Sequence, residues 1–177
     1  MKARIALLVV VLVGIAAVGA STAPARANQS EASKTIVGVA AGDKRFSTLV
    51  ALVKQAGLAK TLSGKGPFTV FAPTNAAFAK LKRTAPDTFA AVAGDKALLT
   101  KVLTYHVVAK NIPSTAAVAA AKKNASVKTV QGEPIKLSIR AGQLTLNGTS
   151  KVIVADVKAT NGVIHAIDTV IVPPSVS

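Results

Sequence analysis

The chain has 177 residues, no Cys, and 22 Lys and Arg against 7 Asp and Glu. This length suits one domain with a hydrophobic core, and the missing Cys excludes disulfides, thiolate sites and a lipidated N-terminal Cys. Aromatic residues make up 3% of the chain, so a platform that stacks the bases of nucleic acid is not expected, and nucleic acid is not a predicted partner.

The N-terminal segment has the pattern of a secretory signal peptide. A basic start with Lys2 precedes the apolar residues 5–18, and small residues form a cleavage site ending at Ala27. The apolar segment is short for a bilayer span, which usually needs about 20 residues. We predict a signal peptide at residues 1–27, with an uncleaved membrane anchor as the alternative, followed by a flexible tail at residues 28–33. The mature protein is then secreted or periplasmic and has no transmembrane span.

The mature chain is strongly basic. Three of the 22 basic residues leave with the signal, so 19 Lys and Arg remain against 7 Asp and Glu, a net charge of +12. A field of this sign attracts anionic partners. Lysines scattered for solubility are the alternative explanation, because the basic runs are short.

Helical spacing dominates the first half of the mature chain. Residues 35–41 predict a short apolar helix, and Asp43 is a good N-cap for the next one. That next helix has apolar residues at positions 46, 49, 50, 53 and 56 and ends at Gly57. Residues 58–62 predict another helical turn, and residues 63–67 form a loop.

The stretch FTVFAPTNAAFAKL changes from strand to helix within a few residues. Residues 68–71 predict a buried strand, and Pro73 is expected to stop its ladder because it has no N–H. The hydroxyl of Thr74 then caps a helix by accepting a hydrogen bond from the N–H of Ala77.

Further helices are followed by a run of strands. Residues 85–92 predict a short helix, Asp95 caps the next one, TYHVV favours strand, and residues after Ser114 are helical again. The period then changes to two, with turns at 131–132, 141–142, 147–148 and 161–162. The strands that we expect are residues 127–130, 135–139, 144–146, 152–157 and 163–172. Helices in the first half and strands in the second indicate an α+β fold.

Three blocks resemble the fasciclin (FAS1) domain family. They are GPFTVFAPTNAAFAKL at residues 66–81, LTYHVV at residues 103–108 and TNGVIHAIDTVIVP at residues 160–173. The resemblance covers residues 34–174 and is that of a secreted, single-domain, bacterial-type member. It implies a β-sandwich or wedge flanked by several short helices, with a role in adhesion and no catalysis.

Five residues within these blocks are expected to hold the motif structure. They are Thr74, Asn75, Asn161, His165 and Asp168, and Asn75 stands where many members of the family have Asp. His165 lies in a run that is apolar on both faces, so we expect a hydrogen-bonded group in the core. A metal site at His106, His165 and Asp168 is not favoured, because two such distant histidines are weak evidence for one.

The Tyr-His segment is the candidate partner-binding site. In animal matrix relatives this segment is associated with integrin binding, and the resemblance carries that role to Tyr105, His106, Val107 and Val108. In a bacterial protein the same face is either used for another partner or purely structural. A surface contact at His106 and a side chain that ties loose backbone groups are the two alternatives.

The sequence lacks the patterns of common enzymes. It has no G-x-S-x-G nucleophile motif, no P-loop around Gly64-Lys65-Gly66 and no obvious pair of carboxylates. We therefore expect a non-enzymatic interaction or adhesion module at the cell surface, in the periplasm or in extracellular matrix, without a cofactor. Expected partners are a cell-surface or matrix protein, anionic polysaccharide or lipid headgroups. The alternative is a carrier of an apolar small molecule such as a carotenoid or lipid, which some algal FAS1 relatives bind.

Overall fold

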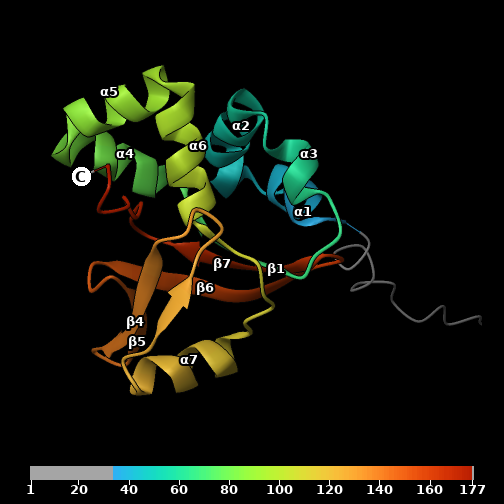
Figure 1. Cartoon of the computed structure of the whole chain (residues 1–177), viewed down its shortest axis with the longest axis vertical. Helices are drawn as coiled ribbons and strands as arrows, with labels where there is room; N and C mark the ends of the chain where they lie inside the picture. Colours follow the sequence, from blue (N-terminus) through green and yellow to red (C-terminus); the bar gives the residue numbers. More distant parts are fainter. Residues whose placement is uncertain (1–33, 177) are drawn as a thin grey trace, which may run out of the picture.

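Helices occupy the first half of the chain, as their apolar spacing predicts. In the computed structural model, which describes residues 34–176, helices α1 to α6 lie together on one side of a curved sheet (Figure 1). The predicted signal peptide and tail, residues 1–33, lie outside the described residues. The helices are α1 (Ile36–Gly42), the 3₁₀ turn η1 (Lys44–Phe46), α2 (Ser47–Ala56), α3 (Ala59–Leu62), α4 (Asn75–Thr84), α5 (Pro86–Gly94), α6 (Lys96–Tyr105) and α7 (Ser114–Lys122).

Local capping sets several of these helix ends. The carboxylate of Asp43 accepts a hydrogen bond from the N–H of Arg45 at 2.9 Å, and that of Asp95 accepts one from the N–H of Ala97 at 2.7 Å. Gly57 ends α2 in the left-handed region, with φ of 77°. The cap predicted at Asp95 and the stop predicted at Gly57 are therefore confirmed. Asp43 caps the 3₁₀ turn η1 and not α2 itself, which begins at Ser47 without a side-chain cap.

The strands form one seven-stranded sheet in the order β2-β1-β7-β6-β5-β4-β3. β1 and β7 are parallel and all other neighbours are antiparallel. The N–H of Val130 donates to the carbonyl of Val107 at 2.7 Å, which brings the two edges of the sheet together. The strands are β1 (Phe68–Pro73), β2 (Val107–Val108), β3 (Ser126–Lys128), β4 (Pro134–Arg140), β5 (Gln143–Leu146), β6 (Ser150–Ala159) and β7 (Gly162–Ile167).

The central strands separate two hydrophobic cores. On one face of β1 and β7, Val70 and Ile164 pack against helices α1 to α6. On the other face, Phe71 and Ile167 pack with β4, β5 and α7, and Figure 1 shows α7 on the side of the sheet opposite the other helices. The predicted α+β fold, a wedge of strands flanked by short helices, is confirmed.

Pro73 is the last residue of β1, but it is paired within the ladder, which corrects the expectation that the ladder stops before it. It pairs with Ile167 in the parallel ladder, and the N–H of Thr74 continues the ladder to the Ile167 carbonyl at 3.2 Å. Backbone N–H groups alternate between the two sides of a strand. The N–H of Phe71 points to the carbonyl of His106 on the β2 side. The missing donor of Pro73 faces the same side, at a level where β2, which begins at Val107, is no longer alongside β1.

Other predicted boundaries are also wrong, and the strand predicted to reach Val130 ends at Lys128. Tyr105 was expected in a strand, but it is the last residue of α6, where its ring is buried and its hydroxyl reaches Pro134. β7 ends at Ile167, five residues before the predicted end. The reason is that the N–H of Ile171 donates to a ring nitrogen of His106 at 3.2 Å instead of to a neighbouring strand.

Among the helices of residues 34–176, none combines the length and the apolar character required to cross a membrane.

Candidate functional site

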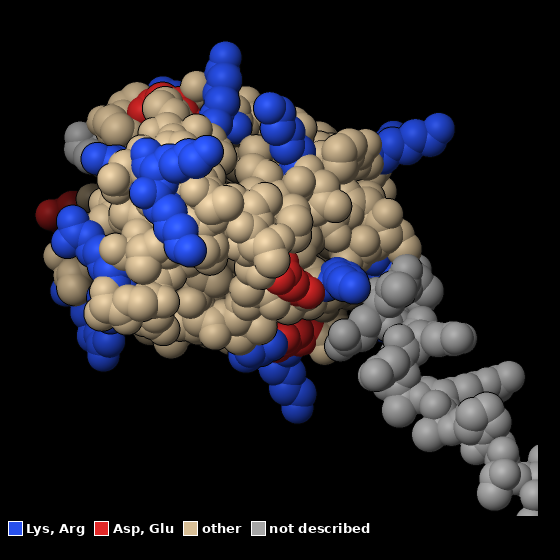
Figure 2. All heavy atoms as spheres, turned by 90° about the horizontal axis from the view of Figure 1, so that it is seen from below, with Lys and Arg blue, Asp and Glu red and all other residues tan. Residues whose placement is uncertain are grey.

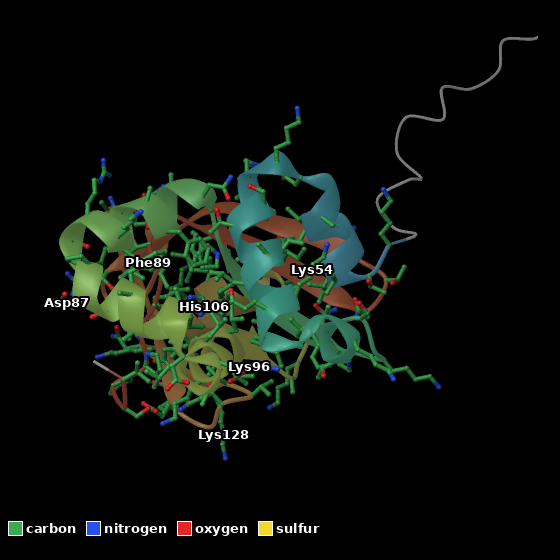
Figure 3. All side chains as sticks on the ribbon, turned by 90° about the horizontal axis from the view of Figure 1, so that it is seen from above. Lys54, Asp87, Phe89, Lys96, His106 and Lys128 are labelled. Carbon is green, nitrogen blue, oxygen red and sulfur yellow. The ribbon has the colours of Figure 1, made fainter. Side chains whose placement is uncertain are left out.

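The Tyr-His segment lies in the interior, at the junction of α6 and β2. Tyr105 is 0% exposed, His106 2%, Val107 3% and Val108 2%. Figure 3 shows His106 in the middle of the molecule when it is viewed from the helical side. A partner of the folded domain therefore cannot contact these four side chains directly, and binding through this segment stays a prediction.

Tyr105 ties the end of α6 to the far end of the sheet. Its hydroxyl donates to the carbonyl of Pro134 at 3.0 Å and accepts from the side-chain amide of Asn147 at 2.8 Å. Burial raises the pKa of Tyr105, so the phenol stays protonated and keeps its role as a donor.

His106 links α6 to the segment after β7. Its Nδ1 lies 2.8 Å from the carbonyl oxygen of Val102, which accepts only, so Nδ1 carries the proton. Its Nε2 then accepts from the N–H of Ile171. Burial lowers the pKa of His106 to about 4, because the charged ring loses its hydration. The ring therefore ties backbone groups, which was one of the two alternatives.

His165 is the second fully buried imidazole. Its Nε2 lies 2.9 Å from the carbonyl oxygen of Ile112, and its Nδ1 accepts from the N–H of Asp156 at 3.2 Å. The ring stacks on Phe71 with 5.7 Å between the ring centroids. Both ring nitrogens are occupied by backbone groups, which leaves neither of them facing an open site.

Asp156 is a structural residue that the sequence analysis missed. It lies at an irregularity of β6 with φ of 58°, and its carboxylate accepts from the N–H of Ser114 at 2.8 Å and from the Ser114 hydroxyl. Burial by itself raises the pKa of Asp156, but the hydrogen bonds from Ser114 outweigh it and lower the pKa. The carboxylate thus caps α7 from a distant strand. The sequence signal for this role is a single acidic residue inside the apolar run VIVADV at residues 152–157.

Asn161 fastens the N-terminal helices to the sheet. Its side-chain oxygen accepts from the N–H of Ile36 at 2.9 Å, and its amide donates to the carbonyls of Leu62 and Gly64 at 2.8 Å each. The next residue, Gly162, has φ of 156°, and a Cβ there would lie 1.9 Å from the carbonyl oxygen of Phe68. Only glycine allows this approach of β7 to β1.

The other expected motif residues also make local structural contacts. Thr74 accepts a long hydrogen bond of 3.4 Å from the N–H of Ala77 at the start of α4. The amide of Asn75 accepts from the N–H of Thr48 at 3.0 Å and donates to the Lys44 carbonyl at 2.9 Å. An Asp at position 75, as in many family members, has no donor for that carbonyl.

Asp168 joins the end of β7 to β6. Its carboxylate accepts from the N–H of Lys151 at 2.8 Å and from the hydroxyl of Thr169 at 3.0 Å. Within residues 34–176, no group of three or more His, Cys, Asp or Glu is placed to hold a metal ion, and Asp168 belongs to no such group.

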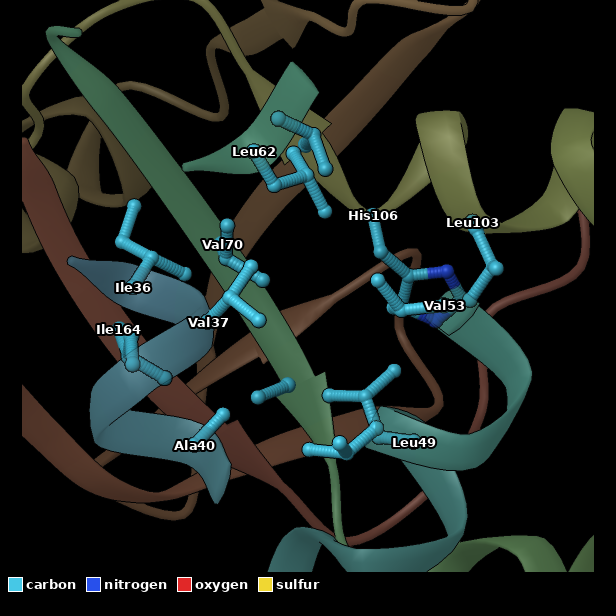
Figure 4. A pocket seen from close by; sticks show the side chains of 13 residues that line it. Ile36, Val37, Ala40, Leu49, Val53, Leu62, Val70, Leu103, His106 and Ile164 are labelled. Carbon is cyan, nitrogen blue, oxygen red and sulfur yellow. The ribbon is translucent and has the colours of Figure 1, made fainter. Parts of the chain in front are cut away.

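An apolar cavity lies between α1, α2 and β1. Its volume is about 30 Å³, and Figure 4 shows Ile36, Val53 and Leu103 around it, with His106 at one side. Pockets that hold drug-sized ligands measure about 300–1,000 Å³. This cavity is much smaller than a carotenoid or lipid needs, so it does not support the carrier alternative.

The surface carries many cations without ionic partners. Within residues 34–176, Arg45 is the one Lys or Arg in a salt bridge, with Asp43 at 2.6 Å. Acids such as Asp95, Asp156 and Asp168 instead accept hydrogen bonds from backbone N–H groups. Figure 2, which views the molecule from below relative to Figure 1, shows Lys and Arg side chains projecting from that face, with Asp and Glu at few places. The charge excess is therefore exposed and available to an anionic partner.

Comparison with known proteins identifies the family. The family model of the fasciclin domain matches residues 44–173, and the chain belongs to the fasciclin (FAS1) domain family. It is 46% identical over 145 residues to protein sll1483 of Synechocystis sp., an alignment that covers 82% of this chain and 77% of that protein.

Two animal proteins show how widely the domain occurs. The chain is 38% identical over 141 residues to transforming growth factor-beta-induced protein ig-h3 of Sus scrofa, covering 80% of this chain and 20% of that longer protein. A solved FAS1 domain pair from the insect cell adhesion molecule fasciclin I has the same fold, with a TM-score of 0.72 at 20% identity. That match covers 82% of this chain and 53% of the domain pair.

Proposed function

We propose that this chain is an exported FAS1 module that binds a partner at the cell surface, in the periplasm or in extracellular matrix, and catalyses no reaction. The observation that carries the proposal is the excess of exposed, unpaired cations on a domain of this family. Such a surface favours encounter with anionic partners, and it contributes nothing to the packing of the hydrophobic core.

The hydrogen bonding of the interior supports a role without catalysis. The rings of His106 and His165 each have both nitrogens bound to backbone groups. The hydroxyl of Ser114 donates to the carboxylate of Asp156, whose own backbone N–H donates to Nδ1 of His165. A general base must reach a reacting proton, and these groups are occupied in holding the fold.

The test combines export with binding to intact cells. We expect the exported form to begin at Asn28, by intact-mass measurement, and to bind the outside of cells of its own source. Binding should weaken as salt rises, because salt screens exposed charges. A basic protein of another family serves as the control. Retention of the whole chain in the membrane fraction, or cell binding no better than that of the control, contradicts the proposal.

A further inference from the structure

A polar hollow lies at the end of the molecule away from α1 to α3, between β4, the β5–β6 turn and Asn124, which follows α7. Its volume is about 310 Å³, and Figure 1 shows β4, β5 and α7 together in this region. The side chains that matter for its chemistry are those of Asn124, Lys136, Ser138, Arg140 and Asn147, and Gly148 also lines it.

Two cations flank one polar group along β4. Lys136, Ser138 and Arg140 alternate along the strand, so their side chains project from the same face. Neither Lys136 nor Arg140 forms a salt bridge within residues 34–176. The guanidinium of Arg140 lies over Gly148, where a Cβ would be 3.3 Å from its Nη2. Because Gly148 has no side chain, the β5–β6 turn leaves room for the guanidinium of Arg140, which has no salt-bridge partner within residues 34–176, beside the hollow.

The wall of the hollow is built by hydrogen bonds that reach the core. The side-chain oxygen of Asn147 accepts from the N–H of Lys136 at 2.9 Å, and its amide donates to the hydroxyl of Tyr105. Asn147 and Gly148 both have positive φ, 50° and 73°, which forms the tight turn. The buried Tyr-His segment therefore positions the turn that carries one side of this hollow.

Further cations extend the hollow into a strip. Lys128 on β3 stands opposite Pro134 in the antiparallel register, on the exposed side of the sheet. From the level of Pro134 to Arg140 is about 20 Å at the usual rise of a strand. Lys122 and Lys123 close α7 just before Asn124. A strip of this length suits an extended polymer with repeated negative charges.

We propose that this hollow binds a carboxylate or sulfate group of an acidic polysaccharide whose chain runs along β3 and β4. Arg140 gives paired donors that match such a planar or tetrahedral anion, and Lys136 adds a point charge. The amide of Asn124 and the hydroxyl of Ser138 suit the hydroxyls of a sugar. This inference rests on the proposed function and names the partner class of that module.

Other macromolecules fit these features less well. The hollow has no aromatic side chain in its lining, whereas single-stranded nucleic acid is held by base stacking. A lipid headgroup surface is broad and flat, and it has no requirement for a recess lined by amides. Ile139 is the one large apolar side chain in the lining.

The experiment measures binding of the exported protein to alginate, a polyuronate, and to dextran sulfate, with neutral dextran as the uncharged control. We expect both anionic polymers to bind and neutral dextran not to bind. The double variant Lys136→Ala/Arg140→Ala should raise the dissociation constant about tenfold, since each lost cation removes a charge-assisted contact. NMR titration with alginate should shift the amide signals of Lys136, Arg140 and Asn147 first.

A matched double variant separates the hollow from net charge. Lys54→Ala/Lys96→Ala removes the same charge from α2 and α6, on the helical side seen in Figure 3, and should weaken binding less than about twofold. Equal losses from the two double variants, or no binding of the unmodified protein to either anionic polymer, overturn the inference. Tighter binding to vesicles of phosphatidylcholine and phosphatidylglycerol, or to single-stranded DNA, overturns it in favour of that partner.

The outcome also stays distinct from that of the proposed function. If the exported protein binds cells and the double variant at Lys136 and Arg140 binds them equally well, the proposed binding site in the hollow is wrong. The proposed function as an interaction module is then still supported. If alginate binding depends on the hollow but the protein is not exported, the proposed location is wrong and the site stands. Circular dichroism of each variant confirms that the domain is folded.

Discussion

The side-chain amide of Asn147 donates a 2.8 Å hydrogen bond to the hydroxyl of Tyr105, which lies 42 residues earlier in the chain. That hydroxyl in turn donates to the carbonyl of Pro134. One buried phenol thus joins the end of α6, the start of β4 and the turn between β5 and β6. The aromatic residue of the Tyr-His segment acts on the protein surface through these partners, although no part of it is exposed.

Tyr105→Phe should lower the free energy of unfolding by about 1–2 kcal/mol, because two hydrogen bonds of the hydroxyl are lost while the ring stays packed. Denaturant unfolding measures the change. A double-mutant cycle with Asn147→Gly, which keeps the positive φ of the turn, should show a coupling of about 0.5 kcal/mol or more. Strict additivity of the two changes would mean that the Tyr105–Asn147 hydrogen bond is energetically unimportant.

His106 should make the fold less stable in mild acid. Its folded-state pKa is about 4, below the unfolded value of about 6.5. The stabilisation is therefore complete above pH 6.5 and is lost as the pH falls toward 4, since the unfolded chain takes up a proton that the folded ring does not. The loss is on the order of 3 kcal/mol.

The variant His106→Asn tests this dependence, since its amide can still donate toward the Val102 carbonyl. It should lower stability at neutral pH and flatten the slope of stability against pH between about 4 and 6.5. Urea unfolding at several pH values, compared with the unmodified protein, measures both effects. An unchanged slope in the variant would show that other groups cause the acid sensitivity.

Asp156→Asn should cost about 1–2 kcal/mol, because the charge that caps α7 is removed while Asn still tolerates a positive φ. Asp156→Ala should cost about 1 kcal/mol more, since a residue with Cβ and no polar group is strained there. The lowered pKa of Asp156 means that its contribution is present above the ordinary carboxyl pKa and disappears as the pH falls through the folded value. Thermal unfolding of both variants at neutral and acid pH is the measurement. Equal losses for Asn and Ala would argue against strain at the positive φ, and a loss that is the same at neutral and acid pH would argue against the role of the charge.

Thr74→Ala should cost about 1 kcal/mol through loss of the cap at the start of α4. Thr74→Ser keeps the oxygen and should cost less. The residue is buried, so the lost methyl group contributes to both changes and the difference between them isolates the hydroxyl. Identical losses in denaturant unfolding would assign the whole effect to the methyl group.

Asn161→Ala should release α1 before the rest of the domain unfolds. The change removes the acceptor for the N–H of Ile36 and both donors to the loop after α3. Hydrogen exchange should become faster for the amides of α1 and stay unchanged in β4 and β5, since local opening follows local contacts. Asn161→Asp is the matched control, because it keeps the acceptor and loses the donors. Uniformly faster exchange across the domain would show that Asn161 stabilises the fold globally.

The sequence by itself determined the helices, the turns and the fold class, because these depend on contacts close along the chain. Asp43 and Asp95 bind N–H groups two or three residues away, and Gly57 needs no partner to adopt a positive φ. The apolar spacing of the first half and the alternation of the second half then indicate helices packed against strands. The hydrophobic run around His165 likewise indicated a strand buried on both faces.

The tertiary structure alone decided which side chains are accessible and which distant groups meet. Pro73 is tolerated in β1 because β2 ends before it, and a local rule about proline contains no information on the neighbouring strand. Tyr105 and His106 are buried because Pro134, Asn147 and Ile171 supply hydrogen-bond partners from 29 to 65 residues away. The meeting of Asp156 with Ser114, and of Arg140 with the turn at Gly148, depends in the same way on strand register and sheet curvature. These are long-range properties that no local pattern of residues specifies.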